Sequence, residues 1–167
     1  AFRQRGCCVM VFEQRANIAE DASSTPAAVF MPRLTAAVST DGQFYEQAWR
    51  HAIALQNNLA KYGKDIEASN CGVLYVAKSS KDVSRLRKIK SCTNLPRSLM
   101  DLVESPEMSR ISGIPLDGVA LHFPHGGWVN PASLCQRLLS DIEVKTRETV
   151  SGLDRSKEKW MLRDPSG

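Results

Sequence analysis

Residues 5–13 read RGCCVMVFE, and this stretch decides the fold that we expect. The uninterrupted apolar run Cys7–Phe12 is short and contains β-branched valines, a combination typical of a strand buried in a sheet. Basic residues and then Gly6 precede the run. They predict that residues 1–5 are the last turn of a helix, with Gly6 as its C-cap. The stretch therefore predicts a helix end, a tight turn and a buried strand that leads into Glu13.

An acidic residue directly after such a strand is a candidate ligand for a ribose. In a dinucleotide-binding βαβ unit, the strand after the first helix ends in a carboxylate that accepts hydrogen bonds from ribose hydroxyls. The glycine-rich turn of such a unit lies about 20 residues earlier, so we expect it before Ala1. A glutamate after a strand is also common in a solvated loop, so both interpretations of Glu13 stay open.

The loop after Glu13 offers a second candidate. Residues 17–26 are small and polar, and within them residues 22–25 read ASST. Backbone N–H groups and hydroxyls in such a loop can bind a phosphate. A plain surface loop has the same composition, so the motif alone does not decide between the two.

The rest of the chain alternates between helical and extended patterns. We expect helices over residues 44–62, 81–89, 95–103 and 131–139, and strands over residues 71–77, 119–123, 142–150 and 159–162, with a turn over residues 152–157. Gly63 would end the first helix, and Asn130 before Pro131 would be the N-cap of the last. This order predicts a mixed α/β fold in which a sheet is interrupted by an inserted lobe.

Composition argues against several classes of protein. The chain has 22 basic and 18 acidic residues, and this net charge of +4 permits contact with nucleic acid without requiring it. The five cysteines form no C-x-x-C pair and no regular framework, which favours a reducing cytoplasm over a disulfide scaffold. No segment reaches the ~20 apolar residues of a membrane helix. His122 and His125 flank Pro124, which argues against a helix that presents both to a metal, so we expect no metal site.

Residues 123–135 read FPHGGWVNPASLC. Gly126 and Gly127 allow a sharp turn or a close approach to a ligand, and Trp128 could line a pocket or fill the core. The stretch resembles the F/Y-P-x-G-G-W-x-x-P-A-x-L signature of the D-amino-acid-oxidase-type family of FAD-dependent oxidoreductases. The likeness extends over nearly the whole chain, with similar residues also at 30–34, 71–73 and 111–113.

Within that family the chain most resembles the branch that completes modified wobble uridines in tRNA. The resemblance implies FAD as cofactor and tRNA as substrate, with the carboxymethyl group oxidatively removed from carboxymethylaminomethyl-uridine. It also implies a partial FAD-binding Rossmann-like sheet with an inserted α+β substrate lobe. Relatives in this branch carry a methyltransferase half, which we expect to be absent from these 167 residues.

The resemblance also assigns roles to individual residues. Glu13 would hold the adenosine ribose of FAD, and Val150 would lie near the adenine. The loop residues that would approach the flavin and pyrophosphate are Ala22, Ser23, Ser24 and Thr25. The expected substrate-side residues are Gly126, Gly127 and Trp128. The expected domains are a partial FAD-binding segment at 1–70, a substrate-side lobe at 71–128 and a return to the FAD-binding domain at 129–167. No catalytic acid or base is nominated, because the flavin carries the hydride.

Two other functions stay open. The chain could belong to an oxidase of small amines such as glycine or sarcosine. It could also be a non-catalytic segment that binds RNA or a protein partner, because residues 22–25 depart from the family's glycine-containing loop. We expect residues 1–167 alone to be inactive and to bind FAD weakly or not at all. Glu13 would contribute ~1.5–3 kcal/mol, less than the ~4 kcal/mol that corresponds to 1 mM affinity. The edge of the strand at 7–12 would be open to a second copy.

Overall fold

The computed structural model describes residues 2–59, 66–156 and 159–165. The chain divides into two compact units, which are described separately. The terminal unit consists of residues 1–26 and 130–167, and the central unit consists of residues 27–129. The expected domain boundary after residue 70 differs from this division, whose first break follows Pro26. The functional roles expected of the domains stay predictions.

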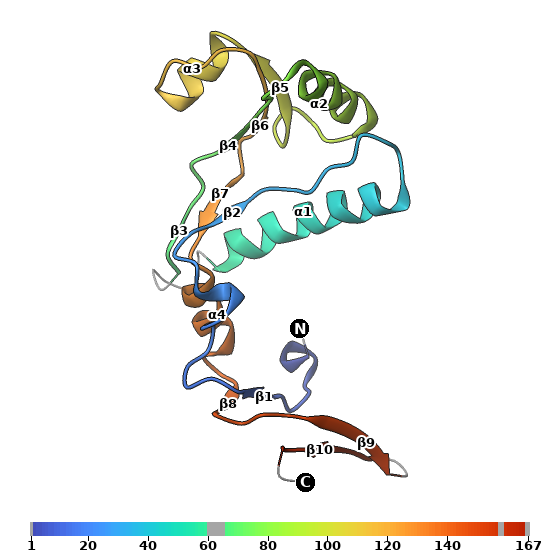
Figure 1. Ribbon diagram of the computed structural model, residues 1–167, viewed down its shortest axis with the longest axis vertical. Coiled ribbons are helices and arrows are strands. Elements are labelled where there is room, and N and C mark those ends of the chain that lie inside the picture. Colours follow the sequence, from blue (N-terminus) through green and yellow to red (C-terminus); the bar gives the residue numbers. More distant parts are fainter. Residues whose placement is uncertain (1, 60–65, 157–158, 166–167) are drawn as a thin grey trace. The chain divides into compact units, whose positions relative to one another are not determined.

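Helices and strands alternate along the chain, as Figure 1 shows. The helices are α1 (Thr40–Leu59), α2 (Ser80–Cys92), α3 (Glu107–Ser112) and α4 (Pro131–Leu139), with 3₁₀ turns η1 (Arg3–Arg5) and η2 (Ala22–Ser24). The strands are β1 (Met10–Glu13), β2 (Ala28–Phe30), β3 (Ala68–Ser69), β4 (Val73–Val76), β5 (Asp101–Glu104), β6 (Val119–Phe123), β7 (Gly127–Val129), β8 (Glu143–Thr146), β9 (Gly152–Ser156) and β10 (Lys159–Arg163). The expected mixed α/β fold is confirmed.

The terminal unit contains a parallel strand pair. β1 pairs with β8 from Met10 opposite Glu143 to Glu13 opposite Thr146. The expectation of a buried strand over Cys7–Phe12 is wrong, because β1 begins at Met10 and both Met10 and Phe12 are exposed. Gly6 ends η1 with φ of 81°, as its expected role as a C-cap requires. β9 and β10 form a separate antiparallel hairpin. No strand among the described residues pairs with the other edge of β1. Pairing of that edge with a second copy stays a prediction.

The central unit holds two antiparallel three-stranded sheets. β6 lies between β4 and β5, and β7 lies between β2 and β3. The chain passes from β3 into β4 and from β6 into β7, and the Gly72 N–H donates to the Gly126 carbonyl between them, at 3.0 Å. This bond links the β3–β4 connection to the β6–β7 connection.

The core of the central unit lies under α1 and α2. Its buried members are Trp49, Leu86, Ile89, Leu95, Met100, Leu121 and Phe123. The Trp49 ring lies 4.8 Å from the Phe30 ring and 6.5 Å from the Phe123 ring, measured between centroids. These contacts join α1 to both sheets, because Phe30 belongs to β2 and Phe123 to β6.

Several expected elements differ from the structure. The helix expected over residues 95–103 is wrong: residues 101–104 form β5, and the N–H groups of Leu99 and Met100 turn back onto the Pro96 carbonyl. Pairing with β6 overrides a weak helical pattern there. The turn expected over residues 152–157 is also wrong, since Gly152–Ser156 is β9. Gly63, the expected end of α1, lies outside the described residues.

Other expectations hold closely. Residues 119–123 and 131–139 have the expected bounds, and Asn130 is the N-cap of α4. Its side-chain oxygen accepts hydrogen bonds from the N–H groups of Ala132 and Ser133, at 3.0 and 3.3 Å. Within the described part of the chain, no helix combines the length and apolar character needed to cross a bilayer.

Candidate functional site

The carboxyl end of β1 holds Glu13 in a defined position. Its Oε1 atom accepts a hydrogen bond from the Arg15 N–H at 2.8 Å, and its side chain is half-buried. Backbone pairing continues past the two strands, because the Glu148 N–H donates to the Glu13 carbonyl at 3.0 Å. The Arg147 N–H likewise donates to the Arg15 carbonyl at 2.9 Å. The Glu13 carboxylate is therefore presented at the end of a parallel strand pair.

The loop after Glu13 is held by its own polar contacts. The Arg15 guanidinium donates to Asp21 Oδ1 at 3.0 Å, and the Asn17 amide donates to Glu20 Oε1 at 2.6 Å. The hydrogen bond from Asn17 lowers the pKa of Glu20 below its usual value. The Ser24 N–H then donates to the Asp21 carbonyl, at 2.9 Å. These bonds hold the loop backbone in place where residues 22–25 begin.

Residues 22–25 combine exposure with uncommitted polar groups. Ala22, Ser24 and Thr25 are exposed and Ser23 is half-buried, while η2 packs against α4. The hydroxyls of Ser23, Ser24 and Thr25 make no hydrogen bond within residues 2–59, 66–156 and 159–165. They are free to bind a ligand that approaches this side of the unit.

Val150 lies between β8 and β9, outside any strand, and its side chain is 41% exposed. It belongs to the same terminal unit as Glu13 and residues 22–25. The expected cofactor residues therefore all fall in one unit, although they come from both ends of the sequence.

The three expected substrate-side residues belong to the central unit, and they differ in exposure. Gly126 and Gly127 are buried, and a Cβ added to Gly127 would lie 1.9 Å from the Ser69 carbonyl oxygen. A Cβ on Gly126 would lie 3.0 Å from the Phe30 carbonyl oxygen. Close backbone packing thus accounts for both glycines. Trp128 is 37% exposed, so it alone of the three offers a side chain to a ligand.

Trp128 shares its sheet face with one markedly exposed neighbour. In the register of the sheet it lies opposite Val29 on β2 and Ser69 on β3. Val29 is 67% exposed. Successive strand residues point to opposite faces, and Gly127 pairs with Phe30, whose ring contacts the core. Trp128 therefore lies on the face away from α1.

His122 is half-buried on β6. Burial lowers the pKa of its imidazole, and the carboxylates of Glu107 and Asp101 oppose that shift. Its Nε2 atom lies 3.3 Å from the position that a Cβ on Gly72 would take. No three His, Cys, Asp or Glu side chains of the described residues gather as metal ligands.

A surface cavity of about 240 Å³ lies in the central unit, between the loop before α1 and the end of α2. Its lining includes Thr35, Gln43, Glu46 and Cys92. None of the expected site residues lines it. The cavity therefore does not contribute to the expected site.

Sequence reasoning missed the residues that position Glu13. Arg147 takes a left-handed conformation with φ of 62°, which is uncommon for a residue other than glycine. This conformation accompanies its hydrogen bond to Arg15. No local pattern marks an arginine for that role, because its partner lies more than a hundred residues earlier in the chain.

The donors and acceptors at the end of β1 fit a nucleotide. Glu13 Oε2 has no hydrogen bond to any described residue, so the carboxylate can still accept one from a ribose hydroxyl. The hydroxyls of residues 22–25 can donate to phosphate oxygens. This chemistry suits a ribose and a phosphate group.

Comparisons with known proteins agree with this chemistry. The sequence model of the family described as "DAO: FAD dependent oxidoreductase" matches residues 1–167. The chain is 33% identical over 162 residues to the tRNA 5-methylaminomethyl-2-thiouridine biosynthesis bifunctional protein MnmC of Magnetococcus marinus, covering 97% of this chain and 24% of that protein. It is 27% identical to the protein of the same name from Paraburkholderia phytofirmans, covering 98% of this chain and 26% of that protein. The chain thus spans about a quarter of the length of the curated relatives it matches.

Solved structures share the fold. A glycine oxidase from Geobacillus kaustophilus superposes with a TM-score of 0.71 at 17% identity, covering 99% of this chain and 47% of that one. The iminodiacetate oxidase of Chelativorans sp. BNC1 superposes with a TM-score of 0.70 at 20% identity, covering 99% of this chain and 47% of that one. At such identities the likeness concerns the fold alone.

Proposed function

The chain belongs to the family of FAD-dependent oxidoreductases, and on that premise we propose that the full-length protein removes the carboxymethyl group from carboxymethylaminomethyl-uridine at the tRNA wobble position. One observation carries the proposal. The first relatives are named for the biosynthesis of a modified tRNA uridine, and the match covers 97% of this chain at 33% identity. A cytoplasmic setting is part of the proposal, because tRNA is the substrate.

The proposed reaction breaks a C–N bond in two steps. The carboxymethyl carbon loses a hydride and the attached nitrogen loses a proton, which leaves a C=N double bond. Water then adds to this bond, and the product separates into aminomethyl-uridine and glyoxylate. FAD, when bound, supplies the acceptor of the two electrons. The protein contributes binding, orientation and exclusion of water from the oxidation step.

The residues of the terminal unit would bind the cofactor. Glu13 would accept hydrogen bonds from the adenosine ribose, Val150 would contact the adenine, and residues 22–25 would bind near the flavin and pyrophosphate. Trp128 would lie on the substrate side, where its exposed ring can stack on a nucleobase. In this proposal, the expected domains at 1–70 and 129–167 bind FAD, and the expected lobe at 71–128 binds the substrate. The word "bifunctional" in the relatives' name supports a second activity in the full-length protein, which in this proposal belongs to a methyltransferase half.

The proposal predicts turnover of one specific nucleoside. Full-length protein incubated with tRNA that carries carboxymethylaminomethyl-uridine should convert it to aminomethyl-uridine, as measured by mass spectrometry of the digested nucleosides. Heat-denatured protein is the control. Unchanged nucleoside in the presence of a flavin absorbance band would overturn the tRNA assignment.

The two rival functions give different results in the same preparation. Peroxide release with free glycine or sarcosine, in the absence of tRNA, would support a small-amine oxidase, the activity named for one structural neighbour. Absence of any flavin spectrum in the full-length protein would support a non-catalytic binding role.

Removal of the Glu13 carboxylate should weaken FAD binding. A hydrogen bond to a charged group contributes ~1.5–3 kcal/mol, so Glu13→Ala in the full-length protein should raise the Kd for FAD about 10- to 150-fold. Titration calorimetry of the apoprotein with FAD measures the change. Glu13→Gln keeps an oxygen for the Arg15 N–H and should give a smaller loss.

Glu143→Ala is the matched control for Glu13→Ala. Glu143 is an exposed glutamate of the same strand pair, but it lies opposite Met10, at the other end of β1 from Glu13. The control should leave the Kd for FAD within about twofold of the wild-type value, since surface changes away from a site have small effects. An equal loss in both variants would show that the Glu13 carboxylate has no specific role in FAD binding.

A further inference from the structure

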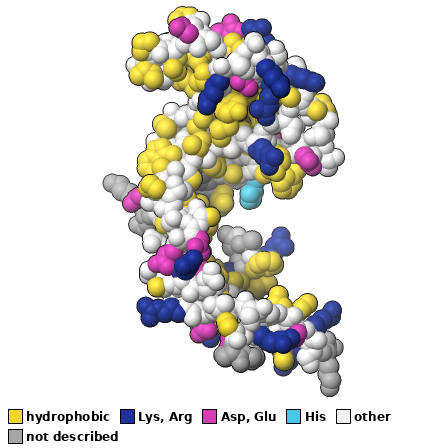
Figure 2. All heavy atoms as spheres, viewed as in Figure 1, with side chains coloured by type: hydrophobic (Ala, Val, Ile, Leu, Met, Phe, Trp, Pro, Cys, Tyr) yellow, Lys and Arg dark blue, Asp and Glu magenta, His cyan; other side chains and the backbone are white. Residues whose placement is uncertain are grey.

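The positive charge of the chain is concentrated in one short segment. Residues 78–97 contain seven of the 22 basic residues and one of the 18 acidic residues, a net charge of +6. The remainder of the chain therefore has a net charge of −2. The segment comprises α2 and its flanking turns. Figure 2 shows Lys and Arg side chains gathered in the region of the molecule where Figure 1 places α2.

The single acidic residue of the segment is committed to the start of the helix. Asp82 Oδ2 accepts hydrogen bonds from the Ser79 hydroxyl at 2.9 Å and from the Lys78 N–H at 3.2 Å. Ser79 Oγ in turn accepts from the Asp82 N–H, at 3.2 Å. This reciprocal cap stabilises the helix N-terminus. Asp82 therefore does not neutralise a basic side chain of the segment.

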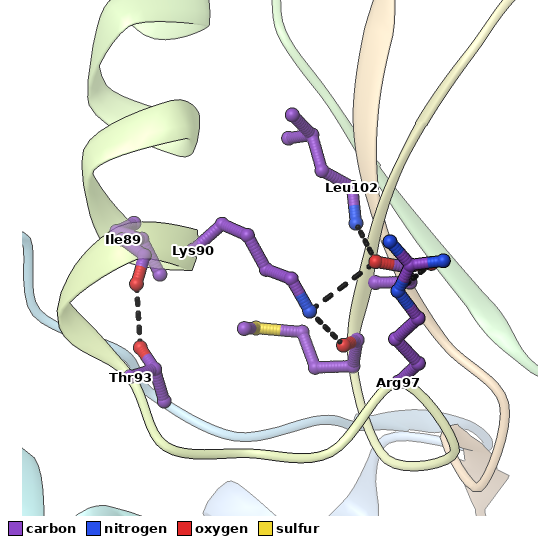
Figure 3. A network of polar contacts seen from close by, with 7 residues as sticks. Ile89, Lys90, Thr93, Arg97 and Leu102 are labelled. Carbon is purple, nitrogen blue, oxygen red and sulfur yellow. Dashed lines mark hydrogen bonds and ion pairs between the residues drawn. The ribbon is translucent and has the colours of Figure 1, made fainter.

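Two of the basic side chains of α2 form ion pairs or hydrogen bonds within the fold. Arg87 pairs with Glu104 of β5 at 2.9 Å. Lys90 donates to the Met100 carbonyl at 2.8 Å and lies 3.2 Å from Asp101 Oδ1. Figure 3 shows the Lys90 amine reaching these oxygens from the end of α2, with the Arg97 guanidinium on the same carboxylate. These contacts tie α2 to β5.

Three other basic side chains form a row on the exposed face. Lys81, Arg85 and Lys88 are spaced by four and three residues, so they neighbour one another along one side of the helix over about 10 Å. All three are exposed, and none pairs with an acidic group of the described residues. Leu86 and Ile89, on an adjoining side of the helix, are buried in the core. The row, named here the α2 basic row, therefore faces solvent.

The composition of this face indicates the kind of partner. Ser84 and Ser91 are the other exposed residues of the face, and no large hydrophobic side chain is exposed in residues 78–97. Protein interfaces have a core of aromatic or aliphatic residues, and helices that lie on membranes have an exposed apolar side. A row of cations on a face without exposed apolar side chains matches the phosphate backbone of a nucleic acid instead.

We propose that the α2 basic row, Lys81, Arg85 and Lys88, binds the phosphate backbone of the tRNA substrate. The inference rests on the proposed function for the identity of the RNA. These contacts position the tRNA without reading its sequence. They leave recognition of the modified uridine to the substrate-side residues.

Binding of unmodified tRNA to the full-length protein tests the proposal without requiring catalysis. The variant Lys81→Ala/Arg85→Ala/Lys88→Ala should weaken binding about tenfold or more near 0.1 M salt. The slope of log Kd against log salt concentration should decrease by about 2, since each phosphate contact to single-stranded nucleic acid contributes about 0.7. Fluorescence anisotropy with labelled tRNA measures both quantities. The flavin spectrum and the melting temperature should match those of wild-type protein.

Two control variants test whether the effect depends on the position of the charges and on the charge of the row. Arg3→Ala/Arg5→Ala/Lys159→Ala removes three exposed cations from the terminal unit and should retain wild-type affinity. Lys81→Arg/Arg85→Lys/Lys88→Arg keeps the charge of the row and should also retain it. An equal loss in the first control, or wild-type affinity in the α2 variant, would overturn the proposal.

Other outcomes distinguish failure of the α2 basic row as a tRNA-binding surface from failure of the proposed oxidation. Tight tRNA binding that depends on the row, without conversion of the uridine, supports the surface and contradicts the oxidation. Conversion of the uridine by the α2 variant with an unchanged KM for tRNA overturns the surface alone. Wild-type protein that binds phosphatidylserine vesicles through the row but does not bind tRNA overturns both.

Discussion

Gly127→Ala should destabilise the protein by about 3 kcal/mol, at the upper end of the range for overpacking a filled site. The added Cβ would lie 1.9 Å from the Ser69 carbonyl oxygen and 3.1 Å from the Asn70 Cα. Both groups are backbone atoms, so no side-chain rotation can relieve the contact. β7 must move away from β3, which breaks the pairing of Trp128 with Ser69.

Thermal unfolding of the full-length protein measures the effect. A loss of this size corresponds to a melting temperature about 6–12 °C lower, for a domain of 150–250 residues. Gly152→Ala is the matched control, since the nearest atoms to its added Cβ belong to the Arg163 side chain at 3.9 Å. A Gly127→Ala protein as stable as the Gly152→Ala protein would contradict the backbone packing described for Gly127.

The consequence for function concerns Trp128. Gly127 lies on the core side of β7, and Trp128 follows it on the other face. The register of β7 with β2 and β3 therefore sets the face of the sheet on which Trp128 lies. Under the proposed function, this explains how a buried pair of glycines can serve substrate binding without touching the substrate.

Trp49→Ala should cost about 3–5 kcal/mol, the usual range for truncating a buried tryptophan. Trp49 is 3% exposed, and its ring contacts Phe30 and Phe123 from the two sheets. The truncation would remove these contacts and leave a cavity between α1 and both sheets. Chemical denaturation should show a lower midpoint, with the slope nearly unchanged if the native fold persists.

Trp49→Phe should cost much less, about 1 kcal/mol or below. The indole Nε1–H is buried without a hydrogen-bond acceptor among the described residues, and an unsatisfied buried donor costs ~1–3 kcal/mol. Phenylalanine removes that donor and keeps an aromatic ring in the cluster. Trp160→Ala, at a position 66% exposed, serves as the control for loss of an indole and should cost less than about 1 kcal/mol. Equal losses of unfolding free energy for Trp49→Phe and Trp49→Ala would contradict the inference that the unsatisfied indole N–H is costly.

Local sequence determined the elements whose signals are strong and short-range. Residues 119–123 form a strand that is apolar except at His122, and Asn130 and Pro131 mark the start of α4 because an N-cap and a fixed φ act within one turn. Gly6 ended the first helical turn for the same reason. The signature at residues 123–135 also indicated the family, which the match over the whole chain shows.

Only the tertiary structure decided the features that depend on distant partners. Residues 101–104 are a strand because β6 pairs with them, and Glu13 is positioned by backbone bonds from residues 147 and 148. Gly127 must be glycine because Ser69, far away in the chain, approaches it. Likewise, the sequence shows seven basic residues at 78–97, but pairing with Glu104 and Asp101 determines which of them stay free. Such pairings join residues far apart in the sequence, so no local pattern encodes them.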